Sequence, residues 1–295
     1  LAIPVYDGEK TPSERFAGAV DTYSIEAMMK DGKAVQAGTS HCLGTTFAEP
    51  IDIKYLDKEN KHVHVHTTSW GTSTRLICSV IMVHGDEQGL VLPPTIAPTQ
   101  VVLVPVGPWK KNPVIIEKLD EIFAALKAKG IRVRLDDSDQ SPGFKFNEWE
   151  LKGVPVRIEL GPRDLDNNQV LMKARDEADK QTVALESVVE AIENELQVMQ
   201  KRLLEKARAF RDANSHTHID SLEALKAHLA ESEQNGTIPG WILAGWCGDD
   251  ECESNVKEET KFTSRNIPFN PPMEKHTCIN CGKEAKHTVW FGRSY

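Results

Sequence analysis

The stretch from residue 100 to residue 135 constrains the fold more than any other part of the chain. It opens with QVVLVPV (100–106), a continuous apolar run typical of a strand buried on both faces. Apolar residues then recur every three or four positions between Pro113 and Leu126, which predicts an amphipathic helix ending at Gly130. IRVRL (131–135) predicts a second strand. This order predicts a parallel strand pair joined by a right-handed crossover.

Further strand signals follow the crossover. VPVRIEL (154–160) predicts another strand, and QVLMKARD (169–176) with QTVAL (181–185) predicts a hairpin or an edge pair. Residues 99–190 are therefore expected to form one compact α/β domain.

Residues 1–98 contain short strand-like runs separated by Gly, Asp and Thr turns, as in an antiparallel sheet. They are HVHVHTTSW (62–70), RLICSVIMV (75–83) and GLVLPP (89–94). The second run predicts a buried strand with Arg75 at its N-terminal end. Burying an isolated cation there costs several kcal/mol unless an anion pairs with it. Arg75 is then either a surface residue by accident or a residue that holds an anionic ligand.

The alternation in HVHVH places His62, His64 and His66 on one face of a predicted strand. Such a row of imidazoles binds a metal in some proteins, but it is more often the solvated face of a strand.

Residues 191–295 are expected to form a third region, entered through a long helix. Its apolar stripe predicts a helix that packs one face on a neighbouring domain, in preference to a coiled coil. Asp220 with Glu223 three residues later has the pattern of a capping box before a further helix.

Four of the six cysteines form two close pairs near the end of the chain, Cys247 with Cys252 and Cys278 with Cys281. Two such pairs supply the four thiolates that a closed, structural Zn²⁺ site needs. Two disulfides are the alternative, and His276 and His287 are less favoured substitute ligands.

Composition and sequence pattern argue against a membrane-spanning protein, a secreted protein and a general nucleic-acid coat protein. No apolar stretch is long enough to span a bilayer, and the N-terminus lacks the pattern of a signal peptide, so we expect a cytoplasmic protein without a membrane partner. The net charge of −9 argues against a general nucleic-acid coat protein but not against a local tRNA-binding face.

The chain resembles a class II aminoacyl-tRNA synthetase, the archaeal and eukaryotic type of prolyl-tRNA synthetase. The segments that carry this resemblance span nearly the whole chain: FAGAVDTYSIEAMM (16–29), QAGTSHCLG (36–44), SWGTSTRLICSVIMVHGDEQGLVLPP (69–94), SPGFKFNEWELKGVPVRIELGPRD (141–164), the cysteine pairs and FGRSY (291–295). The third of these is similar to motif 3 of the family.

The resemblance implies ATP with Mg²⁺ as the cofactor and L-proline and tRNA(Pro) as partners. Arg75 corresponds to the motif 3 arginine, the expected catalytic residue, which contacts the γ-phosphate and adenine of ATP. Gln36, Thr39 and Ser73 match further ATP contacts, and His41 matches a residue that lines the proline pocket.

The resemblance also implies roles for the other two regions. Lys145, Glu148 and Arg163 are expected near the tRNA anticodon, and the four cysteines are expected to hold structural Zn²⁺. The terminus FGRSY matches one that returns towards the active site, so Tyr295 is expected to approach the first region.

The resemblance implies a fold of α/β and α+β parts. It divides the chain into the C-terminal portion of an antiparallel class II catalytic domain (1–98), an α/β anticodon-binding domain with a mixed sheet (99–190) and a small α/β zinc-binding domain (191–295). Motifs 1 and 2 of the family lie upstream of these segments. We therefore expect the back half of a homodimeric enzyme, inactive in proline activation without an N-terminal half. The alternative is a non-catalytic tRNA- or protein-binding module built from synthetase domains.

Overall fold

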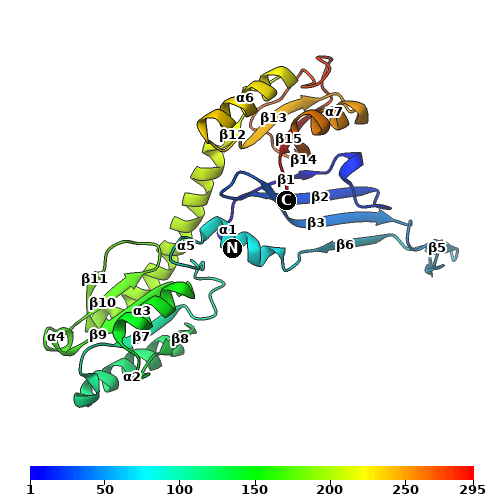
Figure 1. Cartoon of the computed structure of the whole chain (residues 1–295). Helices are drawn as coiled ribbons and strands as arrows, with labels where there is room; N and C mark the ends of the chain where they lie inside the picture. Colours follow the sequence, from blue (N-terminus) through cyan, green and yellow to red (C-terminus); the bar gives the residue numbers. More distant parts are fainter. The chain divides into compact units, whose positions relative to one another are not determined.

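A computed structural model describes all residues from 1 to 295 (Figure 1). The chain forms two compact units, each with its own sheet. One comprises Leu1–Ile3 and Val80–Ala207, and the other comprises Pro4–Ser79 and Arg208–Tyr295. The division falls within two helices, α1 (Arg75–His84) and α5 (Val188–Ala213). None of the helices combines the length and the apolar character that crossing a bilayer requires.

The first unit contains a mixed five-stranded sheet in the order β11-β10-β9-β7-β8. Its elements are β7 (Val101–Pro105), α2 (Pro113–Ala128), β8 (Val133–Leu135), α3 (Pro142–Leu151), β9 (Val156–Leu160), α4 (Pro162–Asp166), β10 (Gln169–Ala174) and β11 (Gln181–Ala184). Strand β7 is parallel to β8 and β9, and β10 is antiparallel to β9 and β11. The predicted parallel strand pair joined by a helix and the predicted hairpin are both confirmed.

Helix α2 covers this sheet with the face that its periodicity predicts. Ile115, Leu119, Ile122 and Leu126 are buried in one cluster with the sheet residues. Each such side chain contributes about 1.5–3 kcal/mol by leaving water. Gly130 follows the helix with φ of +77°, a left-handed conformation that glycine adopts without steric cost.

The N-terminal part of α5 completes the same core. Val188, Ile192 and Leu196 belong to the cluster of the mixed sheet, and Met199 and Leu203 pack with Ala2 and Val91. The apolar stripe therefore buries one helix face in a globular core, and a coiled coil is not formed.

The second unit contains an eight-stranded sheet in the order β12-β13-β15-β14-β1-β2-β3-β6. The first four strands are β12 (Ser215–His216), β13 (Trp241–Trp246), β15 (His287–Gly292) and β14 (Thr263–Pro268), and the others are β1 (Val5–Glu9), β2 (Asp21–Met28), β3 (Ala34–Gly44) and β6 (Thr67–Gly71). Helices α6 (Leu222–Asn235) and α7 (Asp250–Thr260) lie beside β13 (Figure 1).

Strands from the two ends of the chain meet at the pairing of β1 with β14, where Gly8 lies opposite Pro268 and Glu9 opposite Ile267. A Cβ at Gly8 would lie 2.2 Å from the carbonyl oxygen of Ile267, so only glycine permits this approach. The sequence did not predict this junction.

Two predicted strands of the first region are wrong. Residues 75–84 form α1, whose buried Ser79, Val80 and Val83 share one helix face while Ile77 and Ile81 are exposed. A short apolar run without alternation suits a buried strand and a helix equally, and here the spacing of three and four decides.

GLVLPP forms no strand either. The N–H groups of Leu90 and Leu92 donate to the carbonyl oxygens of Leu151 and Gly153, and Pro93 and Pro94 have no N–H with which to extend a ladder.

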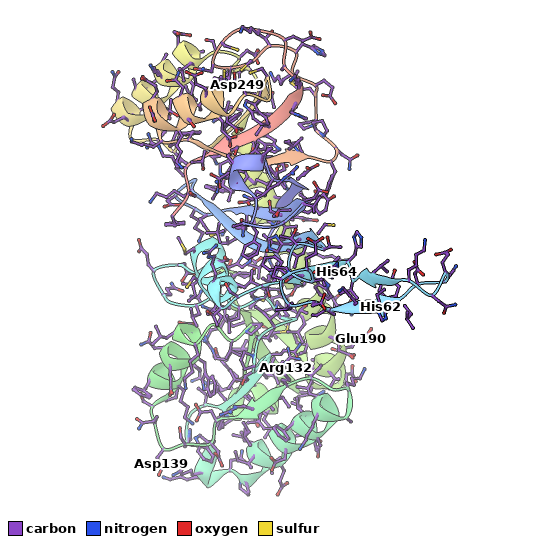
Figure 2. The ribbon with its side chains drawn as sticks, turned by 90° about the vertical axis from the view of Figure 1, so that its right-hand side faces the viewer. His62, His64, Arg132, Asp139, Glu190 and Asp249 are labelled. Atoms are coloured by element: carbon purple, nitrogen blue, oxygen red, sulfur yellow. The ribbon has the colours of Figure 1, made fainter.

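The histidine row is also interrupted. His62 and His64 lie in β5 (His62–His64), which pairs with β4 (Lys54–Leu56), whereas His66 lies between β5 and β6. Figure 2 shows His62 and His64 on this projecting hairpin. His64 Nε2 lies 3.2 Å from Asp52 Oδ1, so its partner in the structure is a carboxylate.

In the first unit, Arg175 forms hydrogen bonds with Asp86, which lies in the turn before Leu90. Its side chain is 2% exposed, and its guanidinium donates two hydrogen bonds to Asp86, at 2.8 and 2.5 Å, and a third to the carbonyl oxygen of Glu150. The hydrogen bonds from Arg175 lower the pKa of Asp86.

Replacing Asp86 by Asn is expected to lower the free energy of unfolding by about 1 kcal/mol at neutral pH, because the half-exposed carboxylate is partly screened by water. The loss should be complete above about pH 4, the usual range of an aspartate, and should vanish as the pH falls through the lowered pKa of Asp86. Urea unfolding of the wild type and of Asp86→Asn, from neutral pH to below about pH 4, measures this difference in free energy. Asp137→Asn, on the exposed loop after β8, is the control. Equal stability of the two variants at neutral pH would contradict the assignment.

Candidate functional site

A polar pocket of about 350 Å³ lies where β3, β6 and the start of α1 meet in the second unit. All five residues that the sequence predicts for ATP and proline line it: Gln36, Thr39, His41, Ser73 and Arg75. The structure therefore brings together side chains that are up to 39 positions apart in the chain (75 − 36).

The register of β3 explains how these side chains share one face. Thr39 lies opposite Gly71 and His41 opposite Ser69, and alternate residues of paired strands point the same way. Strict alternation would turn Gln36 to the other face. A bulge prevents this, because Gly38 pairs with Ile25 and Gln36 pairs with Glu26, which leaves Ala37 unpaired.

Arg75 is the first residue of α1 and is exposed. Its backbone N–H donates to Ser73 Oγ at 3.3 Å, while no acidic side chain pairs with its guanidinium. An arginine without an acidic partner at a helix N-terminus attracts an anion, and the planar guanidinium fits phosphate oxygens. The sequence predicts Arg75 at the N-terminal end of a strand, but the residue begins a helix. Its position still favours an anionic ligand.

The C-terminal residues lie along the turn between β2 and β3. The N–H of Ala34 donates to the carbonyl oxygen of Arg293 at 2.7 Å, and Tyr295 Oη donates to Asp31 Oδ2 at 2.7 Å. Lys33 Nζ lies 4.7 Å from the centre of the Tyr295 ring. Burial and the carboxylate of Asp31 raise the pKa of Tyr295, so the phenol stays protonated and donates. Tyr295 therefore contacts the first region, on the turn that leads into Gln36.

The three residues expected near the anticodon differ in exposure. Arg163 is exposed on α4, and Glu148 on α3 is partly exposed and paired with Lys152 at 2.5 Å. Lys145 is 1% exposed, and its ammonium donates to the carbonyl oxygen of Asp136 at 2.8 Å. This burial and this hydrogen bond speak against a direct contact of Lys145 with a base, while its place near the anticodon stays a prediction.

The four paired cysteines converge on one point. Their sulfurs all lie within 4.8 Å of one another, and Cys247 Sγ lies 3.9 Å from Cys281 Sγ. A zinc ion bound tetrahedrally at about 2.3 Å requires sulfur separations of about 3.8 Å, so the arrangement fits this ion. All the cysteines are free thiols, and neither His276 nor His287 belongs to the group.

Local turns place these sulfurs. Cys247 directly follows β13, and Cys252 lies on α7, whose start is capped by Asp249 (Figure 2). The turn after Cys278 is closed by the hydrogen bond from the Gly282 N–H to the Cys278 carbonyl oxygen. Gly282 has φ of +71°, which explains the glycine next to Cys281.

The pocket also contains residues that the sequence did not single out, chiefly Ser69 and Gly71 of β6. The alternation of small polar residues Ser69, Gly71 and Ser73 was the available signal, but only the pairing of β6 with β3 shows which face they occupy.

Comparison with known proteins agrees with this architecture. Residues 100–195 match the anticodon binding domain, and residues 233–295 match the family model described as prolyl-tRNA synthetase, C-terminal. The chain is 60% identical over 295 residues to the proline–tRNA ligase of Symbiobacterium thermophilum, and about half identical to those of Alkaliphilus oremlandii (50%) and Lachnospira eligens (48%).

Each alignment includes the whole of this chain and 60% of the relative, so the chain spans about three fifths of the length of these proteins. Taken together, the two domain matches and the relatives show that this chain is similar to the C-terminal part of prolyl-tRNA synthetases.

Proposed function

We propose that this chain forms the C-terminal part of a proline–tRNA ligase and supplies part of its ATP and proline site. One observation carries the proposal: the five side chains expected from the resemblance line a single pocket, and its arginine has no acidic partner in the protein. The relatives named proline–tRNA ligase are similar over the whole chain.

In this reaction an oxygen of the proline carboxylate attacks the α-phosphate of ATP, and pyrophosphate leaves as prolyl-adenylate forms. The prolyl group then passes to a hydroxyl of the terminal ribose of tRNA(Pro), and AMP is released. Negative charge accumulates on the phosphates, where a preorganised cation lowers the barrier. Arg75 would pair with phosphate oxygens and Gln36, Thr39 and Ser73 would orient the nucleotide, while His41 would contact proline. Bound Mg²⁺ would supply further positive charge at the phosphates.

The remaining parts of the proposal rest on the family. Residues 1–98 would belong to the catalytic domain, 99–190 would bind the anticodon through exposed groups such as Glu148 and Arg163, and 191–295 would form the zinc-binding domain. The extra C-terminal domain favours the archaeal and eukaryotic architectural type, here shared with bacterial relatives. We further propose a cytoplasmic homodimer whose interface lies mainly in an N-terminal part of the enzyme.

The activity test is proline-dependent exchange of pyrophosphate into ATP, with the chain joined to the N-terminal segment that its relatives carry. Arg75→Ala is expected to lower the exchange rate about 100-fold or more, since it removes a cation that acts where charge develops. Arg75→Lys should recover only part of it, because an ammonium lacks the planar fork. Arg134→Ala, at an exposed arginine of β8, is the control.

Full exchange by Arg75→Ala would contradict the assigned role. Binding of tRNA without any proline-dependent exchange in the joined protein would instead favour the non-catalytic binding module.

We also propose that the four cysteines hold one structural Zn²⁺, which leaves no open position for a substrate. Elemental analysis is expected to find one zinc per chain, and Cys278→Ser should reduce the zinc content and lower the melting temperature. Cys78→Ser, at an exposed cysteine outside the group of four, is the matched control. Protein purified without chelator and free of zinc would refute the site.

The contact of the C-terminus with Asp31 yields a separate expectation. Deleting Ser294 and Tyr295 should lower the exchange rate, because the turn that leads into Gln36 loses its partner. Tyr295→Phe removes only the hydroxyl and should have a smaller effect. Exchange of the deleted protein at the wild-type rate would show that the terminus has no part in the site.

A further inference from the structure

His41 lines the pocket, and a residue of the neighbouring strand forms a hydrogen bond with one of its two ring nitrogens. Its Nδ1 lies 3.0 Å from Thr22 Oγ1, and Thr22 is the residue directly opposite His41 in the pairing of β2 with β3. The protein forms no hydrogen bond with Nε2. The remaining ring nitrogen is therefore the one available to a ligand.

The hydrogen bonds of Thr22 determine the direction of this contact. Thr22 is 2% exposed, and its hydroxyl accepts the backbone N–H of Phe16 at 3.3 Å. A hydroxyl has one proton to donate, and a buried one needs an acceptor for it. Within reach of Thr22 Oγ1, the acceptor is Nδ1 of His41. If His41 instead donated from Nδ1, the buried hydroxyl proton would have no partner.

Packing holds the ring in this orientation. The centre of the Phe16 ring lies 5.1 Å from that of the imidazole, and the centre of the Phe47 ring lies 6.4 Å from that of Phe16. The residue that donates its N–H to Thr22 thus also packs on the ring that Thr22 orients.

We propose that Thr22 is a positioning residue that keeps neutral His41 protonated on Nε2, so that the pocket offers an N–H donor at this point. Such a donor binds an oxygen of the substrate and cannot accept from an ammonium group. The inference rests on the proposed function for the identity of the substrate. There, His41 takes an oxygen of the carboxyl group of proline or of the prolyl-adenylate, and another group must hold the amine.

The first test measures the proton directly in the 295-residue chain, with ¹⁵N-detected imidazole spectra above the usual titration range of histidine. His41→Gln identifies the signals. We expect a protonated Nε2 and an unprotonated Nδ1 whose shift reports a hydrogen bond. Thr22→Val should remove that bond and move the Nδ1 signal, and Thr22→Ser should keep it. Thr68→Val, on the exposed neighbouring β6, is the control. A proton on Nδ1 in the wild type would overturn the proposal.

The second test uses proline-dependent exchange in the protein joined to its N-terminal segment. Thr22→Val should raise the KM for L-proline about tenfold while the KM for ATP changes less than about twofold, in line with one hydrogen bond to the amino acid. General damage to the pocket would raise both constants, and Thr22→Ser should restore the wild-type value. An unchanged KM for proline in Thr22→Val would overturn the positioning role.

The two tests separate the inference from the function on which it rests. Absence of exchange in the wild-type joined protein would reject the proposed function, while the spectra would still decide the state of His41. Exchange with the expected spectra but no effect of Thr22→Val would reject only the positioning role.

Discussion

The antiparallel pairing of β1 with β14 is the contact on which the second unit depends. It joins strands from both ends of the chain into one sheet, so the pocket on β3, the C-terminal residues and the thiol cluster share a single scaffold. Close in sequence to the paired residues of β1, Lys10 Nζ lies 2.8 Å from Glu26 Oε1, and both side chains are almost wholly buried. Burial lowers the pKa of Lys10 and Glu26 opposes that shift, so the pair stays tolerable only while both partners are present. The Thr11 hydroxyl adds a further link between the two ends of the chain, because it donates a hydrogen bond to buried Glu253.

The pocket depends on this scaffold for precision. Its donors come from a bulged strand, a paired strand and the start of a helix, and none of these elements could place them alone. The bulge at Ala37 turns Gln36 to the face of Thr39, and the chain end lies on the turn just before that strand. The hydrogen bond from the Ala34 N–H to the Arg293 carbonyl oxygen therefore joins the chain end to the strand that carries Gln36, Thr39 and His41.

The α/β core was predictable because its signals are local. The run at 100–106 is rich in valine, which favours a strand, the spacing after Pro113 favours a helix, and a short crossover then fixes their order. The β1–β14 junction was not predictable, since strand partners more than 250 residues apart leave no local pattern except Gly8, which reads as an ordinary turn residue. Helix α1 was missed for the opposite reason, because its apolar run allows two structures and tertiary burial chooses between them. The pocket residues were predicted from the resemblance, while their common face needed the register.

Charged residues show the limit of sequence reasoning most clearly. Lys145, Arg175 and Lys10 are each at most 6% exposed and are paired with carboxylates or carbonyl oxygens, yet in the sequence they look like any surface cation. Such groups hold loops and strands together, because a buried charge without a partner costs several kcal/mol. Arg75 has the reverse character, since it is exposed, begins a helix and has no acidic partner. It is also the cation to which the proposed function assigns the phosphates of ATP.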